Sequence, residues 1–209
     1  MAYFLCNNGG GASGIKLDKT LLGTGSSGSS NVSITLRHDY HDFDFLMFEY
    51  IYVSNNKYDL NILTTPEMID ESFTNGYNNY LNMCGAAGDL VYISKISNTE
   101  FTLHGGISGY GYIKNIYGCN INADISKNML YTRGSVANTN VTPEIENFLD
   151  YDIIVMSTCS DRTKLGYNPT FCSSAFKGLF NGGILYAWDE STHKLAQEKY
   201  FAIQGIKFT

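Results

Sequence analysis

The stretch Asp42-Phe43-Asp44-Phe45-Leu46-Met47 decides the fold of this chain, because it returns later as Asp150-Tyr151-Asp152-Ile153-Ile154-Val155. In both places two aspartates enclose an aromatic residue, and an unbroken apolar run follows. The second stretch lies 108 positions after the first (152 − 44). A pattern that recurs with its order of residue types intact indicates one structural unit used twice.

Other blocks of the sequence recur in the same order. Lys19 precedes a Leu-Leu pair, and Lys127 precedes a Met-Leu pair at the same offset of 108 (127 − 19). Ile116-Tyr117-Gly118 is echoed by Ile203-Gln204-Gly205 at the shorter offset of 87 (203 − 116). The second copy has therefore lost residues between its blocks, and such losses belong in surface loops.

The composition favours β-structure. The 209 residues include 16 Tyr, 12 Phe and 21 Gly but only 3 Pro, and 16% of them are charged. Aromatic residues are enriched in strands, and glycine in the turns that join them. We therefore predict an all-β fold of two tandem antiparallel β-sandwich modules of the jelly-roll type, at 15–121 and 122–209, after a flexible Gly-rich arm at 1–14.

Apolar periodicity places the strands. Val32, Ile34 and Leu36 alternate with polar residues, which is typical of a strand with one wet face. In contrast, 43–53 is apolar on both faces, so we expect a strand covered on both sides by the sister module or by a second subunit. The expected strands are 32–36, 43–53, 58–62, 90–96, 101–104, 109–119, 151–159, 183–188 and 200–208, and the expected helix is 66–73 with Thr65 as its N-cap.

Charge and cysteine usage exclude several classes of protein. A net charge of −6 with only 14 Lys and Arg argues against a surface that tracks phosphates, so we expect no nucleic-acid partner. The start of the chain lacks the features of a signal peptide, and no apolar run approaches the roughly 20 residues that span a membrane. The cysteines are odd in number without Cys-x-x-Cys spacing and read as free thiols of a reducing cytosol: Cys6, Cys84, Cys119, Cys159 and Cys172.

The segment His38-Asp39-Tyr40-His41-Asp42-Phe43-Asp44 is the strongest candidate for chemistry, since it holds two imidazoles and three carboxylates. The second copy serves as an internal control. Its matching segment lacks both histidines, while Asp42 and Asp44 return as Asp150 and Asp152. The recurrence predicts that these aspartates cap a turn at the start of a strand, and it argues against a metal site.

Other motifs lack the context that their chemistry needs. The match of 9–14 to G-x-G-x-x-G follows no strand and opens no amphipathic helix, so we expect an arm rather than a nucleotide site. The chain has no Gly-x-Ser-x-Gly elbow to accompany its histidines, and no pair of carboxylates stands out for glycoside hydrolysis. We predict no catalytic residue, no cofactor and no bound metal, and thus a protein that is not an enzyme. The four histidines are His38, His41, His104 and His193.

Two aromatic segments have the character of sugar-binding surfaces. Tyr77, Asn78, Asn79 and Tyr80 combine rings that can stack on a pyranose with amides that can bind its hydroxyls, and Tyr110 with Tyr112 offers a second such surface. Tyrosine is also a common strand residue that packs its ring and keeps its hydroxyl wet. Both interpretations stay open.

The repeat resembles a known group of modules. The segments 19–22, 31–36, 43–53 and 113–119 resemble β-sandwich modules in the structural proteins of tailed bacteriophages and prophages, notably those of gut bacteria. The resemblance is closer in the first module than in the second, whose closing segment reads Phe201-Ala202-Ile203-Gln204-Gly205. It implies a non-enzymatic virion structural protein of a tail fibre, baseplate, head fibre or decoration type.

The same resemblance implies where the protein acts and what it binds. It implies synthesis in the bacterial host cytoplasm and a final location in the virion. The expected partners are other virion proteins, which the arm at 1–14 would contact, and further copies of the chain in a homo-oligomer such as a trimer. Two alternatives remain: an adhesin that binds a host-surface glycan, and a hydrolase of polysaccharide or cell wall.

Overall fold

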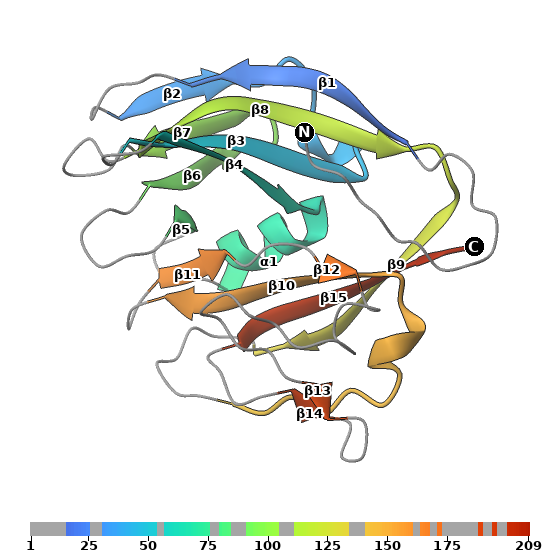
Figure 1. Cartoon of the computed structure of the whole chain (residues 1–209). Coiled ribbons are helices and arrows are strands. Elements are labelled where there is room, and N and C mark those ends of the chain that lie inside the picture. The colour runs from blue at the N-terminus through green and yellow to red at the C-terminus, as the bar shows by residue number, and fades with distance from the viewer. Residues whose placement is uncertain are drawn as a thin grey trace.

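The computed structural model of the chain describes residues 16–25, 31–53, 57–75, 80–84, 91–104, 111–133, 141–160, 164–167, 171–172, 188–189, 194–195 and 200–209. Within these ranges the regular structure is mostly β-strand in antiparallel sheets, together with a single α-helix (Figure 1). The predicted all-β class is confirmed for this part of the chain.

The first sheet is built around a strand that is apolar on both faces. Its order is β1-β8-β3-β4, so the central pair is β8 and β3. The strands are β1 (Leu17–Thr24), β3 (Phe45–Val53), β4 (Lys57–Thr64) and β8 (Gly111–Ile121).

The second sheet contains strands from both predicted modules. Its order over the described residues is β2-β7-β6-β5-β11-β10-β15-β9, with β12 also paired to β10. The junction is the parallel pairing of β5 with β11, at Leu81 and Leu165. The strands are β2 (Val32–Thr35), β5 (Tyr80–Cys84), β6 (Val91–Ser97), β7 (Glu100–His104), β9 (Ile125–Thr132), β10 (Ile153–Ser160), β11 (Lys164–Tyr167), β12 (Phe171–Cys172) and β15 (Tyr200–Phe208); β13 (Trp188–Asp189) and β14 (Lys194–Leu195) form a separate ladder.

Most expected elements are confirmed within a few residues. The expected strands at 32–36, 43–53, 58–62, 90–96, 101–104, 109–119, 151–159 and 200–208 correspond to β2, β3, β4, β6, β7, β8, β10 and β15. The sequence does not predict β1, β5, β9, β11, β12 or β14. In β1 and β9, polar residues such as Asp18 and Asn128 interrupt the apolar pattern. The arm at 1–14 lies outside the described residues, as does the expected strand at 183–188 except for Trp188.

The helix α1 (Pro66–Asn75) begins where the sequence predicts. The hydroxyl of Thr65 accepts a hydrogen bond from the Met68 amide at 3.2 Å, which confirms the N-cap. Glu67 lies in the first turn, where a negative charge favours the helix dipole. The helix packs on two sides, because the buried Ile69 and Phe73 enter one apolar core and the buried Met68 enters another. Figure 1 shows α1 between β3 and β4 on one side and β10 and β15 on the other.

Three apolar cores fill the described part of the fold. The first core lies on one side of β3, the third core lies on the far side of β10, and the central core lies between the two strands. The first core comprises Leu22, Ile34, Leu36, Tyr40, Leu46, Phe48, Ile69, Phe73, Ile93, Phe101, Leu103, Ile113 and Ile116. The central core comprises Phe45, Met47, Leu63, Met68, Cys119, Ile153, Val155, Ala202 and Ile206. The third core comprises Ile145, Phe148, Tyr151, Ile154, Met156 and Ile203.

Strands β3 and β10 are each buried on both faces. In β3, Phe45 and Met47 enter the central core, whereas Leu46 and Phe48 enter the first core. In β10 the residues 153 and 155 enter the central core, and 154 and 156 enter the third. This confirms the predicted cover on both sides for 45–48 of the expected strand 43–53. Part of the cover comes from the second half of the same chain, residues 122–209.

The sequence repeat extends to the pairing of the backbone. In the β3–β8 ladder Phe45 lies opposite Cys119, and in the β10–β15 ladder Ile153 lies opposite Ile206. The two pairs are related by the sequence offsets of 108 and 87 (153 − 45 and 206 − 119). Since the side-chain period of a strand is two, an equal register places equivalent residues on equivalent faces.

The outer ladder of each half repeats in the same way. Leu17 of β1 lies opposite Ile121 of β8, and Ile125 of β9 lies opposite Phe208 of β15. Even the irregularities of the ladders recur at the two offsets. They lie between Glu49 and Tyr50 in β3, between Ser157 and Thr158 in β10, between Leu21 and Gly23 in β1, and between Met129 and Tyr131 in β9.

A glycine in each half accepts the ring of the repeated aromatic residue. A Cβ atom on Gly118 would lie 2.4 Å from Cγ of Phe43, and one on Gly205 would lie 2.5 Å from Cγ of Tyr151. Real Cβ atoms do not approach ring atoms so closely, so the ring can occupy this position only because glycine has no side chain. The recurrence of this glycine in the two sequence blocks is thereby explained.

We expect Gly118→Ala and Gly205→Ala each to lower the free energy of unfolding by about 1–3 kcal/mol, because the added methyl group displaces a packed ring. Urea denaturation measures both. Combining Gly118→Ala with Phe43→Leu removes the clash and should cost less than the sum of the single changes. A fully additive pair would contradict this explanation of the glycine.

Candidate functional site

The candidate segment 38–44 forms a 3₁₀ turn. Tyr40–Asp42 is the turn, and Asp39 caps it by accepting a hydrogen bond from the His41 amide at 2.9 Å. The amide of Asp42 closes the turn on the Asp39 carbonyl at 3.1 Å. Because the chain bends here, Asp39 and His41 are brought to the same place, together with residues from distant parts of the sequence.

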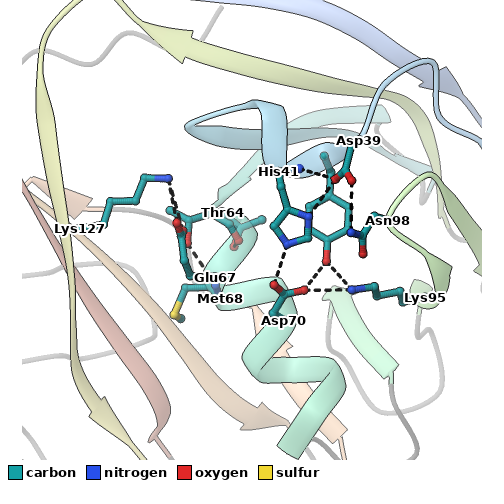
Figure 2. A network of polar contacts seen from close by, with 11 residues as sticks. Asp39, His41, Thr64, Glu67, Met68, Asp70, Lys95, Asn98 and Lys127 are labelled. Carbon is teal, nitrogen blue, oxygen red and sulfur yellow. Dashed lines mark hydrogen bonds and ion pairs between the residues drawn. The ribbon is translucent and has the colours of Figure 1, made fainter.

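The imidazole of His41 is held between two carboxylates. Its Nδ1 lies 2.9 Å from Oδ1 of Asp39, and its Nε2 lies 2.7 Å from Oδ2 of Asp70 on α1 (Figure 2). The ring also stacks on that of Tyr40, with ring centroids 4.1 Å apart. With a carboxylate at each nitrogen, the ring is set up to donate two hydrogen bonds as an imidazolium.

The second oxygen of Asp70 completes a compact polar cluster. It accepts hydrogen bonds from the Tyr40 hydroxyl and, at 3.1 Å, from Nζ of Lys95 on β6 (Figure 2). Nζ of Lys95 also donates to the Tyr40 hydroxyl at 2.7 Å. The phenol therefore lies between an anion and a cation.

Asn98 ties the turn to the β6–β7 connection. Its side-chain amide donates to Oδ2 of Asp39 at 3.2 Å, and its backbone carbonyl accepts a hydrogen bond from the Tyr40 backbone amide at 3.2 Å. We call the group formed by Asp39, Tyr40, His41, Asp70, Lys95 and Asn98 the turn cluster. It joins the 3₁₀ turn, the helix and a β-hairpin.

The charges of the turn cluster support one another. Partial burial alone would lower the pKa of His41, but the hydrogen bonds and charges of Asp70 and Asp39 outweigh it and raise that pKa. Burial would raise the pKa of Asp70, yet its bonds to His41, Tyr40 and Lys95 lower it. Burial, with the adjacent Asp70, raises the pKa of Tyr40 far above its ordinary value. At neutral pH the phenol is thus protonated and both aspartates are ionised.

This arrangement suits a structural clamp better than proton transfer. An imidazolium with both nitrogens engaged has no free lone pair with which to act as a general base. The ring of Tyr40 is fully buried in the first core, and Nζ of Lys95 lies over it, 5.1 Å from the ring centroid. The chemistry that the turn cluster performs best is to attach the turn to the helix.

The repeated aspartates hold the end of a neighbouring strand. Oδ2 of Asp44 accepts a hydrogen bond from the Ile121 amide at 2.9 Å, and Oδ2 of Asp152 accepts one from the Phe208 amide at 2.8 Å. The predicted architectural role is confirmed, but the prediction of a local turn cap is wrong for these two side chains. They cap the far strand because the antiparallel register places the last amides of β8 and β15 beside them.

The remaining candidates are less informative. His104 lies on β7 with its Nε2 2.9 Å from Oγ of Ser94, and burial lowers its pKa. Cys119 is a free, buried thiol, and burial raises its pKa to about 12. Tyr112 is half-buried on β8. The sugar-binding candidates at 77–79 and Tyr110, the glycines at 9–14 and His193 lie outside the described residues, as does Cys6.

The sequence gives no signal for the partners of His41. Asp70, Lys95 and Asn98 lie in three later segments, and nothing in their local pattern marks them. In the described ranges no three His, Cys, Asp or Glu side chains converge as metal ligands would. Nor does any helix there have the length and apolar character needed to cross a membrane.

Comparison of the chain with known protein families, with characterised proteins and with solved structures finds no match.

The raised pKa of His41 predicts a pH dependence of stability. The stabilisation is complete below the ordinary histidine pKa of about 6.5 and is lost as the pH rises through the higher folded-state value. The side chain is 37% exposed, so we expect only about 0.5–1 kcal/mol after solvent screening. His41→Gln should remove this part of the pH dependence of the free energy of unfolding.

His38→Gln is the matched control, since His38 lies beside the same turn and meets the Phe43 ring edge-on. It should leave the pH dependence in place. If the two variants change it equally, the clamp between Asp39 and Asp70 is not its source.

We expect Asp44→Ala and Asp152→Ala each to cost about 1–2 kcal/mol of unfolding free energy, because a strand-end amide loses its charged acceptor. The exposed Asp42 and Asp150 are matched controls, and Asp42→Ala and Asp150→Ala should change stability by less than about 0.5 kcal/mol. Equal losses at all four positions in thermal denaturation would contradict the strand-cap role.

Proposed function

We propose that this chain is a non-enzymatic structural protein of a tailed-bacteriophage particle, in a fibre, baseplate or capsid-surface assembly. The proposal begins from the resemblance of the segments 19–22, 31–36, 43–53 and 113–119 to virion β-sandwich modules. The β-rich fold is consistent with it. In this proposal the protein is made in the host cytoplasm and ends in the virion.

The observation that carries the non-enzymatic part is the turn cluster. Its titratable groups bind one another: His41 bridges Asp39 and Asp70, and Asp70 also binds Lys95. A catalytic site holds groups poised toward a substrate, whereas these groups join a turn, a helix and a hairpin. The segment 38–44, the strongest candidate for chemistry in the sequence, thus has a structural role.

The architecture that we propose is two β-sandwich modules, at 15–121 and 122–209. In the first, β2, β6 and β7 would form the layer opposite the β1-β8-β3-β4 sheet, and the first core contains side chains from both. The matched ladders of β9, β15 and β10 support a second unit of the same plan. Rigid β-modules of this kind suit a particle that must survive outside a cell.

The proposed partners are other virion proteins and further copies of the chain. Attachment would use the arm at 1–14, whose glycines suit a segment that becomes ordered on binding. The homo-oligomer, such as a trimer, rests on the resemblance alone. The doubly apolar strands do not demand a second chain for the faces that form the central core, because they cover each other there.

Purified particles provide the test. An antibody against the chain should label intact particles released from lysed host cells, and quantitative mass spectrometry should find the chain at a fixed number of copies per particle. A chain lacking 1–14 should remain in the soluble lysate. If the chain is absent from purified particles, the proposal is wrong.

The glycan-binding adhesin is the second candidate. Of the aromatic candidates, the structure describes Tyr80 as the first residue of β5 and Tyr112 as a half-buried residue of β8. Binding of the isolated protein to host cells or to a glycan array would favour this alternative. Release of reducing ends from host polysaccharide would instead favour the hydrolase and overturn the non-enzymatic proposal.

A further inference from the structure

The two halves of the chain meet through equivalent faces of equivalent strands, β1, β8 and β3 in the first half and β9, β15 and β10 in the second. Phe45 and Met47 of β3 lie in the central core, and so do Ile153 and Val155, which occupy the equivalent positions of β10. Further along the face, the equivalent residues Cys119 of β8 and Ile206 of β15 lie in the same core, and the equivalent Leu17 and Ile125 pack against it.

The opposite faces of the two sheets are separated from each other. Leu46 and Phe48 lie in the first core, whereas their equivalents Ile154 and Met156 lie in the third. Ile116 and its equivalent Ile203 are divided in the same way. Each sheet therefore turns one defined face toward the other half and the opposite face away from it.

This arrangement fixes the symmetry that relates the halves. Two equivalent sheets that present the same face to each other must have their face directions reversed. A rotation that reverses the direction of a face is a half-turn about an axis in the plane between the sheets. A surface that meets its own copy across a two-fold axis is the isologous contact found in homodimers.

We infer that the two halves dock through one self-complementary surface used twice, around a pseudo-two-fold axis, so that the chain is the covalent counterpart of a homodimer. The surface is the face of β1, β8 and β3 that carries Leu17, Phe45, Met47 and Cys119, and its partner is the equivalent face of β9, β15 and β10. This inference concerns assembly within the chain and does not depend on the proposed virion role.

Polar contacts from α1 add to the apolar surface. The hydroxyl of Thr65 donates to Oε1 of the buried Gln204 at 2.5 Å, and Glu67 pairs with Nζ of Lys127 at 3.2 Å. Gln204 and Lys127 stand where the first half has Tyr117 and Lys19 (204 − 117 = 87 and 127 − 19 = 108). Of these two positions only Gln204 differs from its equivalent, so the contact between Thr65 and Gln204 is the one that distinguishes the second half from a copy of the first.

A face-exchange experiment in the full chain tests the inference. One variant gives the first half the residues of the second: Phe45→Ile, Met47→Val and Cys119→Ile. A second makes the reciprocal changes: Ile153→Phe, Val155→Met and Ile206→Cys. The full exchange combines all six. If the surface is used twice around a two-fold axis, the full exchange rebuilds the contacts among these six residues with the halves interchanged, while Leu63, Met68 and Ala202 of the same core stay in place.

We expect each half exchange to lower Tm by about 5–10 °C and the full exchange to melt within about 4 °C of the wild type. The matched control exchanges Leu46 with Ile154 and Phe48 with Met156, which face separate cores. In this control, the decreases in Tm caused by the changes in each half of the chain should add.

A full exchange that melts at or below the less stable half exchange would overturn the inference. If neither half exchange folds, the comparison of the full exchange with the wild type decides alone: folding with near-native Tm supports the inference, and failure to fold contradicts it.

Discussion

Burial of β3 and β10 on both faces is the constraint on which the rest of the structure depends. A strand with apolar side chains on both faces needs a packed layer on each side, and a single sheet does not provide these layers itself. The chain solves the problem by setting the two strands against one another across the central core, with Met47 on one side and Val155 on the other. The first and third cores then cover the faces that point outward.

The doubled framework carries different attachments in its two halves. A 3₁₀ turn precedes the doubly buried strand in each half, at Tyr40–Asp42 and at Phe148–Asp150. In the first half Tyr40 sends its hydroxyl into the turn cluster, whereas the equivalent Phe148 has no hydroxyl and is fully buried in the third core. Both rings are thus buried in an apolar core, and at the first turn the polar contacts of the turn cluster are added to this packing. Histidine is an addition to the framework rather than a part of it.

Local patterns in the sequence predict β2, β3, β4, β6, β7, β8, β10 and β15, because apolar periodicity is a local property. Strand 43–53 and helix 66–73 are found within two residues of their expected ends. The partners of the strands are not local, so the nine-stranded sheet across both halves of the described chain was not predictable. The same limit applies to Asp44, which was predicted to have an architectural role but whose partner is an amide 77 positions away. It also applies to Asp70, which meets His41 only because α1 packs beside the turn. The repeat compensates in part, since it distinguishes the aspartates that recur from the histidines that do not.

The central core, to which both halves contribute, holds the two halves of the molecule together. Native-state hydrogen exchange measures this most directly, because it gives the free energy and the denaturant dependence of the opening that exposes each amide. We expect the amides of β3, β8, β10 and β15 to exchange through a single opening with a common free energy. Exchange of β10 and β15 through a separate opening of lower free energy, while β3 and β8 stay protected, would contradict it.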